Sequence, residues 1–258
     1  MMATRQAFDR HAAEYGEAWS RNPVARLQRD RLWALVDDRF FAPVRLLDAG
    51  CGAGDDVERA MQRGHTVVGL DQSPGMLEQV RKRTPEVEVQ LGDVRRLSAL
   101  SGQPEFDGAL LNFGVLNCVE SPAEVASALA RHISLDGWVF AVWMPRFAWG
   151  EVLHFACRGH VRAAFRRWPG QGRVDVGNER VQTWFHTVER VRRDFLPWFE
   201  LDQVESLAAL LPPPRQAADR SFERTMRARL DQRVRKWPAF RLTGDHVVAV
   251  FRRRNSGP

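Results

Sequence analysis

Tyrosine and cysteine are scarce in this chain, and neither offers a metal site or a disulfide framework. Tyr15 is the single tyrosine, and the three cysteines are Cys51, Cys118 and Cys157. An odd number of cysteines without C-x-x-C or histidine spacing argues against both a disulfide framework and a zinc site, and it fits a reducing cytoplasm. No other metal-ligand cluster is visible, so we expect a protein that works without a metal.

Long hydrophobic runs and lysines are also lacking. The first twenty residues contain no apolar run of signal-peptide length, and stretches such as WVFAVW are far too short to span a membrane. We therefore expect a soluble, unexported protein with no membrane insertion. The net charge of +6 comes almost entirely from arginine, because Lys82 and Lys236 are the only lysines. These arginines alternate with acids along the chain, which favours a solvated basic surface over a nucleic-acid footprint.

Strand-like and helix-like segments alternate from residue 44, a pattern typical of a parallel sheet covered by helices on both faces. Strands are expected at 44–49, 66–71, 87–93, 106–112 and 137–143, and helices at 56–64, 73–83 and 121–133. Ser73 is placed to cap the helix at 73–83, and Ser121 with Glu124 has the spacing of a capping box.

The pattern changes after Pro145. Residues 151–168 predict one basic helix with an apolar stripe of Leu153, Cys157, Ala164 and Trp168, and residues 173–185 predict a hairpin that turns at Gly177 and Asn178. The α/β pattern then resumes with helices at 187–199 and 221–237 and strands at 199–207 and 245–254. Residues 147–186 are therefore expected to be an insertion that covers the ligand-binding edge of the sheet.

The stretch VRLLDAGCGAGDD, residues 44–56, predicts a strand that ends in Asp48 and turns through Gly50, Gly52 and Gly54 into a helix. Such a turn brings bare backbone N–H groups and a helix N-terminus to the carboxyl edge of the sheet, where a ligand can lie against them. A dinucleotide fingerprint requires a third small residue where this chain has Asp55, so NAD and FAD are disfavoured.

Three further strand ends carry polar residues or glycine at the same edge. Asp71 ends the second strand, where a carboxylate can accept both hydroxyls of a ribose. Gly92 and Asp93 end the third strand, and Asn112 and Phe113 end the fourth. Together with the glycine loop, these ends predict a bound nucleoside.

These motifs resemble those of the class I S-adenosylmethionine-dependent methyltransferases. LLDAGCGAG is similar to their motif I, VVGLDQSPGML to motif II and LGDVRRL to the third-strand motif. The N-terminal AFDRHAAEYGEAW resembles a subgroup that includes quinone-biosynthesis and natural-product enzymes. The resemblance covers residues 5–145 and the last strand, and it implies an α/β, Rossmann-like, doubly wound seven-stranded sheet. That sheet would be mostly parallel with an antiparallel last strand, and a small helix-hairpin insertion would follow the fifth strand.

The resemblance implies three regions: an N-terminal helical segment over the cofactor site (1–40), a core (41–146 and 187–258) and a cap (147–186). The cofactor would be S-adenosylmethionine, converted to S-adenosylhomocysteine. The residues implied to bind it are Tyr15, Asp48, Gly50, Cys51, Gly52, Asp71, Gln72, Met76, Gly92, Asp93, Val94, Asn112 and Phe113. One of Arg26, Arg29 and Arg31 would pair with its carboxylate.

The reaction implied is in-line displacement at the activated methyl group, with a base where the nucleophile must lose a proton. His154, His160 and His186 are candidate bases because imidazole titrates near neutral pH. His246, beside Asp245, is interpreted as structural.

The acceptor is expected to be a small molecule, aromatic or lipid-like. The Asn/Asp-Pro-Pro-aromatic motif of adenine and glutamine methylating enzymes is replaced by NFGV at 112–115. The aromatic residues expected to line an apolar pocket or to pack the cap are Phe147, Trp149, Phe155, Phe165, Trp168, Trp184 and Phe185. Two alternatives stay open: an RNA or protein methyltransferase that docks through its arginines, and a binding subunit without turnover.

Overall fold

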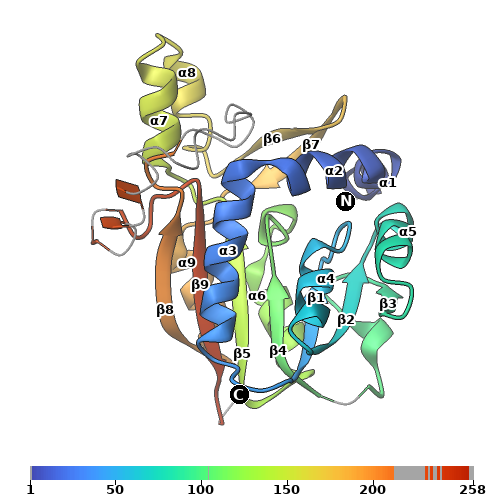
Figure 1. The fold of residues 1–258 in the computed structure, drawn as a ribbon. Helices are drawn as coiled ribbons and strands as arrows, with labels where there is room; N and C mark the ends of the chain where they lie inside the picture. The colour runs from blue at the N-terminus through green and yellow to red at the C-terminus, as the bar shows by residue number, and fades with distance from the viewer. Residues whose placement is uncertain are drawn as a thin grey trace.

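The computed structural model describes residues 2–103, 105–211, 230, 231, 233, 234, 237, 238 and 240–255. Three helices precede the first strand, namely α1 (Met2–Arg10), α2 (Ala12–Arg21) and α3 (Pro23–Asp37) (Figure 1). Helix α3 starts where it does because the Asn22 side chain accepts hydrogen bonds from the Val24 and Ala25 N–H groups, with Pro23 at the first helical position.

The main sheet has seven strands, as predicted. They are β1 (Arg45–Ala49), β2 (Thr66–Asp71), β3 (Glu88–Leu91), β4 (Phe106–Leu111), β5 (Ile133–Trp143), β8 (Phe199–Leu207) and β9 (His246–Arg253). Their order is β3-β2-β1-β4-β5-β9-β8, and β9 runs antiparallel to both of its neighbours. The predicted fold class, including the antiparallel last strand, is confirmed.

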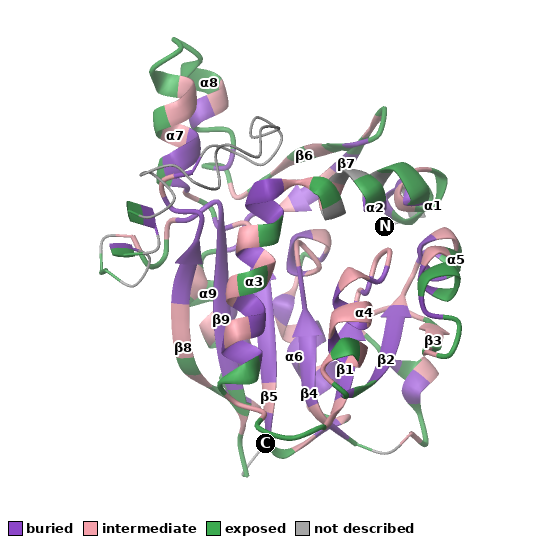
Figure 2. Cartoon of the chain, in the orientation of Figure 1, coloured by how far each residue is buried: buried purple, intermediate pink, exposed green. Residues whose placement is uncertain are grey.

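Helices cover both faces of this sheet (Figures 1 and 2). One core cluster joins the strands to α3, α4 (Asp55–Gln62) and α5 (Pro74–Arg83), with Trp33 fully buried. The other joins them to α6 (Pro122–Leu129) and α9 (Val188–Phe195), with Phe195 fully buried. Burial from both sides explains why the central strands have continuous apolar runs instead of alternating ones.

The strand order places a ligand crevice at the middle of the sheet. From β1 the chain proceeds outward through β2 and β3, then returns to β4 on the other side of β1 and continues to β5. At such a reversal the two loops leave the carboxyl ends of β1 and β4 in opposite directions, which opens a crevice between them.

The insertion contains two short helices, α7 (Trp149–Ala156) and α8 (Val161–Ala164), and the hairpin of β6 (Gln171–Val176) and β7 (Glu179–Trp184). The hairpin is confirmed, with its turn at Gly177 and Asn178. The prediction of one continuous helix over 151–168 is wrong, because the chain turns between α7 and α8 at Gly159, whose φ is +75°.

The predicted apolar stripe on this segment is also wrong. Leu153, Cys157 and Trp168 are exposed and only Ala164 is buried. The inside of the helix pair is occupied instead by an ion pair between Glu151 and Arg167.

The two predicted caps have different outcomes. Ser73 caps α5 as predicted, and its Oγ accepts a hydrogen bond from the Met76 N–H. Ser121 precedes α6 but makes no side-chain capping bond, so the predicted capping box is absent. The helix predicted at 221–237 lies mostly outside the described residues.

Helices α1 and α2 lie over α5 and the β6–β7 hairpin, whereas α3 packs on the sheet. Asp9 of α1 accepts hydrogen bonds from Ser73 Oγ–H at 3.0 Å and Gly75 N–H at 2.6 Å. These bonds attach the N-terminal helices to the loop after β2. The division into an N-terminal segment, a core and a cap stays a prediction.

Candidate active site

The loop after β1 presents backbone to the crevice. Gly50, Gly52 and Gly54 all have positive φ, and Gly54 starts α4. A Cβ added to Gly50 would lie 2.5 Å from Val115 Cγ2, whereas one added to Gly52 would have no atom within 4 Å. Gly50 is therefore required by packing, and Gly52 leaves an opening that a ligand can occupy.

Asp71 connects the end of β2 to this loop. Its carboxylate accepts hydrogen bonds from the Gly52 N–H at 3.0 Å and the Ser73 N–H at 2.9 Å. Burial raises the pKa of Asp71, and hydrogen bonds from the Ser73, Gly52 and Gln72 N–H groups only partly oppose this rise. The carboxylate is thus held in one orientation at the mouth of the crevice.

A single cavity brings together the ends of the first four strands. Ten of the thirteen residues predicted to bind the cofactor line it, and they are Gly50, Gly52, Asp71, Gln72, Met76, Gly92, Asp93, Val94, Asn112 and Phe113. Asp48 and Cys51 are buried beneath the loop and do not line the cavity. The side chain of Tyr15 lies outside what the structure describes.

Asp48 is a buried carboxyl group under the glycine loop. Burial raises its pKa well above the usual value, Asp56 adds to this rise, and Arg29 opposes it. Within the described part of the chain, its buried Oδ2 has no hydrogen-bond partner. Arg29 contacts Asp56 at 3.1 Å, and Arg31 pairs with Glu205 instead. Of the two arginines, Arg29 is therefore the one beside the loop.

Asp93 has a partner of its own. Arg95 contacts both carboxylate oxygens, the shortest contact being 2.5 Å from Nη2 to Oδ2. Burial alone would raise the pKa of Asp93, but the hydrogen bonds and charge of Arg95 outweigh it and lower the pKa. Asp93 is therefore an ionised acceptor at the end of β3.

Phe113 lies where the loop after β4 meets α2 and α3. Its φ is +42°, which is unusual for a residue with a side chain. The Asn112 side chain supports this conformation, since its Oδ1 accepts from the Phe113 N–H and its Nδ2 donates to Asp56. Arg29 lies 4.8 Å above the ring, and Trp19 stacks on it at 6.5 Å.

The other half of the cavity consists of residues that the sequence analysis did not assign. They are Phe8, Leu70, Gly114, Val115, Asn117, Cys118, Val119, Met144, Val174, Val176, Val181 and Thr183. Four of these come from the hairpin, where alternate residues of each strand point to the same side. This period of two was the available signal, but the sequence alone did not show which side faces the cavity. The lining is mostly apolar.

None of the three candidate bases lines this cavity. His160 is exposed and His154 is partly exposed on α7. His186 is buried, and its Nε2 lies 2.9 Å from the Val119 carbonyl and 3.1 Å from that of Leu116. Burial lowers the pKa of His186. A neutral imidazole that donates a hydrogen bond to the backbone therefore explains the buried position of this residue.

The aromatic side chains of the insertion do not line the cavity either. Neither the five in 147–168 nor Trp184 and Phe185 are among its lining residues. Phe185 is buried, and Trp149, Phe165 and Trp168 are exposed. Of the two roles that the sequence left open for these rings, lining this cavity is therefore not observed, and the insertion contributes hairpin residues to it instead.

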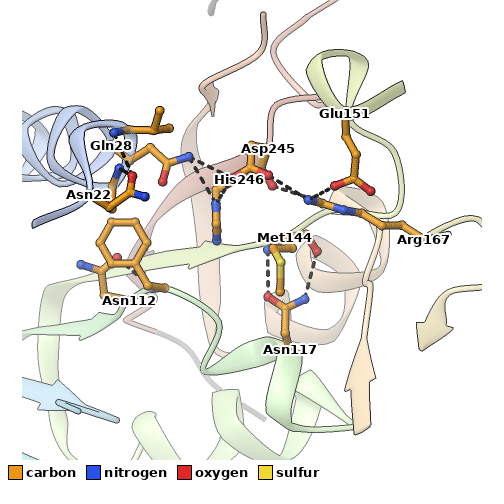
Figure 3. Close-up of polar contacts among 12 residues, drawn as sticks. Asn22, Gln28, Asn112, Asn117, Met144, Glu151, Arg167, Asp245 and His246 are labelled. Carbon is orange, nitrogen blue, oxygen red and sulfur yellow. Dashed lines mark hydrogen bonds and ion pairs between the residues drawn. The ribbon is translucent and has the colours of Figure 1, made fainter. Parts of the chain in front are cut away.

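His246 holds a position that the sequence analysis did not recognise (Figure 3). Its Nδ1 lies 2.8 Å from Asp245 Oδ2, and its ring contacts Phe113 edge-on with centroids 5.7 Å apart. Figure 3 shows the ring pointing toward the space between Asn112 and Met144, both of which line the cavity. Among the described residues, no hydrogen-bond partner occurs for its Nε2.

A buried ion cluster holds Asp245 in place. Arg167 donates to Asp245 Oδ1 at 2.8 Å and to Glu151 Oε2 at 2.6 Å (Figure 3). Burial would raise the pKa of Asp245, but His246 and Arg167 hold it well below the usual range. The carboxylate is ionised and orients the imidazole of His246.

Two features are absent from the part of the chain that the structure describes. No helix there is long and apolar enough to cross a membrane. No group of three or more histidine, cysteine or acidic side chains is arranged to hold a metal ion in the same part of the chain.

Comparison with protein families matches residues 46–137 to a methyltransferase domain. Trans-aconitate 2-methyltransferase of Methylobacterium nodulans is 37% identical over 106 residues, which is 40% of this chain and 39% of that protein. A dTDP-4-amino-2,3,4,6-tetradeoxy-D-glucose N,N-dimethyltransferase of Saccharopolyspora spinosa is 29% identical over 49% of this chain and 57% of its own length. The alignments thus cover about half of these proteins or less.

Two solved structures share the fold over nearly the whole chain. The N-methyltransferase NodS of Bradyrhizobium japonicum, solved with S-adenosylhomocysteine, has a TM-score of 0.62 at 15% identity and covers 98% of this chain and 100% of its own. The 1,6-didemethyltoxoflavin-N1-methyltransferase of Burkholderia thailandensis has a TM-score of 0.60 at 16% identity, with coverages of 98% and 88%.

Proposed function

We propose that this chain, whose residues 46–137 belong to the methyltransferase domain family and whose fold is that of class I methyltransferases, transfers a methyl group from S-adenosylmethionine to a small acceptor. One observation carries the proposal: the glycine loop, Asp71 and the ends of β3 and β4 line one cavity with an apolar acceptor half. S-adenosylhomocysteine is bound in both structural relatives, which supports the same cofactor here.

The residues present fit S-adenosylmethionine. The open side of Gly52 leaves room for a ligand against the backbone, and Asp71 offers a fixed carboxylate for the ribose hydroxyls. Gln72, Met76 and Asp93 line the same cavity. Gln72 and Met76 would flank the adenine, and Asp93 would lie at the polar edge of the adenine ring. When bound, the cofactor supplies a methyl group on a positively charged sulfur.

The protein's contribution would be alignment and exclusion of water. The acceptor atom must lie about 3 to 3.5 Å from the methyl carbon and opposite the sulfur. The side chains of Phe8, Val115, Val176 and Val181 would enclose the acceptor, and Asp9 attaches α1 to the loop after β2. An apolar wall of this kind suits a small acceptor with hydrophobic surface, as the sequence predicts.

We further infer that the acceptor loses its proton to His246. The imidazole is not itself a lining residue, but it is buried against Phe113, which lines the cavity, and the ionised Asp245 would keep a proton on its Nδ1. Nε2 would then take the acceptor's proton while the acceptor atom bonds to the methyl carbon and the carbon–sulfur bond breaks. Asp245, whose Oδ2 lies 2.8 Å from Nδ1, would stabilise the resulting imidazolium.

The two alternatives have less support. An RNA or protein acceptor would need a continuous basic face at the cavity mouth, but the hairpin and α1 bring valines and phenylalanine there. A subunit that only binds the cofactor would have no use for an enclosed acceptor half.

All three cysteines are free thiols, which supports the proposed cytoplasmic location.

Calorimetric titration with S-adenosylmethionine, S-adenosylhomocysteine and NAD tests the cofactor, and transfer of a labelled methyl group to a panel of phenols, thiols, amines and carboxylic acids tests the activity. We expect micromolar binding of both sulfur nucleosides, no binding of NAD and transfer to at least one class. Binding of NAD alone would contradict the proposal. Tight binding without transfer to any acceptor would favour the binding subunit.

A further inference from the structure

The segment that contains α7 and α8 buries an ion pair and exposes several large apolar side chains. Glu151 and Arg167, the charged side chains on the inside, have exposed fractions of 2% and 3%. Val161 and Trp168, on the outside, have exposed fractions of 60% and 58%. A helix pair that only covered the core would bury its apolar side chains and expose its charged ones, so this arrangement indicates a surface that contacts something apolar.

The exposed apolar side chains form one surface, here called the projecting patch, which consists of Trp149, Leu153, Val161, Phe165 and Trp168. Trp149 and Leu153 are four residues apart on α7 and share a helix face, whereas Val161 begins α8 and Phe165 follows its last residue. Phe147 joins the two helices, since its ring contacts Trp149 at 5.0 Å and Trp168 at 6.2 Å. Trp168 in turn contacts Phe165 at 6.3 Å, so the aromatic part of the patch is continuous.

The charges around the patch are of one sign. Glu151 is the only acidic residue in 146–170, and it is buried against Arg166 and Arg167. Arg146, Arg158 and Arg162 are exposed around the patch. None of these three arginines has a carboxylate partner in the part of the chain that the structure describes. The patch therefore combines exposed aromatic and aliphatic side chains with uncompensated positive charge.

The helix pair also projects beyond the body of the protein. Figure 1 shows α7 and α8 extending past the end of the sheet at which β6, β7 and α1 lie. Figure 2 shows exposed residues at their far end. A broad flat surface could therefore contact the far end of the helix pair without colliding with the sheet.

We propose that the projecting patch docks this protein onto the surface of an anionic lipid bilayer. Tryptophan and phenylalanine favour the boundary between lipid headgroups and acyl chains, and flanking arginines are attracted by anionic headgroups. A second copy of the chain is a poorer occupant, because a symmetric contact would bring the arginines of both copies together. A nucleic acid is also poorer, because five large apolar side chains would face phosphates.

The bilayer contact is peripheral and reversible. The patch comprises two short helices, so only its apolar side chains would enter the headgroup region. Docking would place the cavity end of the protein toward the lipid, which suits a hydrophobic acceptor. That last point rests on the proposed function, but the docking itself does not.

Vesicle flotation tests the proposal with the purified full-length chain. Vesicles of phosphatidylcholine alone are compared with vesicles that also contain phosphatidylglycerol, at low and high salt. We expect the protein to float with the anionic vesicles at low salt, and much less with neutral vesicles or at high salt.

Two double variants separate the apolar and charged contributions. Phe165→Ser with Trp168→Ser, and Arg158→Gln with Arg162→Gln, should each weaken binding to anionic vesicles about tenfold or more, since each arginine near such a surface contributes about fivefold. The control variants are Phe41→Ser, whose side chain is 91% exposed elsewhere, and Arg131→Gln. Circular dichroism and cofactor titration confirm that each variant is folded.

Three results would overturn the proposal: no flotation of the wild-type protein, equal flotation with neutral and anionic vesicles, or variants that float as well as the controls. A wild-type protein that binds cofactor yet stays off all vesicles would overturn the docking alone. Loss of cofactor binding with intact flotation would contradict only the proposed function.

Discussion

The Asp71 carboxylate accepts a hydrogen bond from the Gly52 N–H at 3.0 Å, which joins the acidic end of β2 to the glycine loop after β1. The same carboxylate accepts from Ser73, at the start of α5. One side chain therefore sets the relative position of the two segments that would hold the ribose and the methionine part of the cofactor.

Replacing Asp71 should abolish tight cofactor binding. In Asp71→Asn the amide cannot accept from both backbone N–H groups and the ribose, so we expect affinity for S-adenosylhomocysteine to fall about 10- to 100-fold, the loss of one or two charge-assisted hydrogen bonds. Calorimetry measures it. Glu86→Gln, at an exposed acid, is the matched control and should bind like the wild type.

The pH dependence of this binding follows from the same carboxylate. Because burial raises the pKa of Asp71, it becomes protonated at a higher pH than an ordinary aspartate. The protonated group loses an acceptor site, so affinity should fall as the pH drops toward that raised pKa. The Asp71→Asn variant should not show this loss of affinity at acidic pH. A wild-type affinity that is constant down to the pKa of an ordinary aspartate would contradict the assignment.

Two glycines offer a matched test of the loop. Gly52 and Gly102 have φ values of +52° and +79°, and a Cβ on either would meet no atom within 4 Å. Alanine should cost each site about 1–3 kcal/mol of stability from backbone strain. Only Gly52→Ala should also lose cofactor affinity, because only Gly52 lines the cavity. Equal affinities in the two variants would show that the ligand does not lie against Gly52.

The buried ion cluster should be sensitive to loss of its cation. Arg167→Leu leaves Asp245 and Glu151 buried with fewer partners, so we expect a loss of about 3–5 kcal/mol in the free energy of unfolding. Arg131→Leu, at an exposed arginine, should change it by less than about 0.5 kcal/mol. Chemical denaturation measures both. Similar values for the two variants would contradict the structural role of the cluster.

The cysteines should differ sharply in reactivity. Burial raises the pKa of Cys118 from 9.0 to about 12, so its thiolate fraction at neutral pH is about a thousandfold lower than that of an unperturbed thiol. Cys157 is exposed, and Cys51 is buried. Iodoacetamide should therefore label Cys157 first, as peptide mass spectrometry can show, and Cys157→Ser should remove the fast phase. Rapid labelling of Cys118 would contradict the raised pKa of its thiol.

His246→Gln should separate chemistry from binding. If His246 accepts the proton, kcat should fall about 10²- to 10⁴-fold with an acceptor that must lose a proton, while affinity for S-adenosylhomocysteine is retained. His160→Gln, at an exposed histidine, is the control. An unchanged rate and pH profile in His246→Gln would leave this residue a purely structural role.

The strands, and the residues at their ends that line the cavity, could be predicted from the sequence because their signals are local. Apolar runs that end in Asp48, Asp71 and Asp93 mark the strand ends, and parallel strands bring such ends to one edge. The three glycines mark a turn that only a residue without Cβ can make easily. Here a few neighbouring residues determine both the conformation and its position in the fold.

The acceptor half and the insertion were decided by contacts between residues far apart in the chain. His246 reaches Phe113, and Arg167 reaches Asp245, only after the sheet has formed. The same holds for Val176 and Val181, whose alternation predicts a hairpin but not which face closes the cavity. In α7 and α8 the apolar spacing predicted an inward stripe, and the buried Glu151–Arg167 pair reversed it. A charged side chain can be buried when it forms an ion pair with a residue far away in the sequence, and no local sequence pattern shows where that residue is.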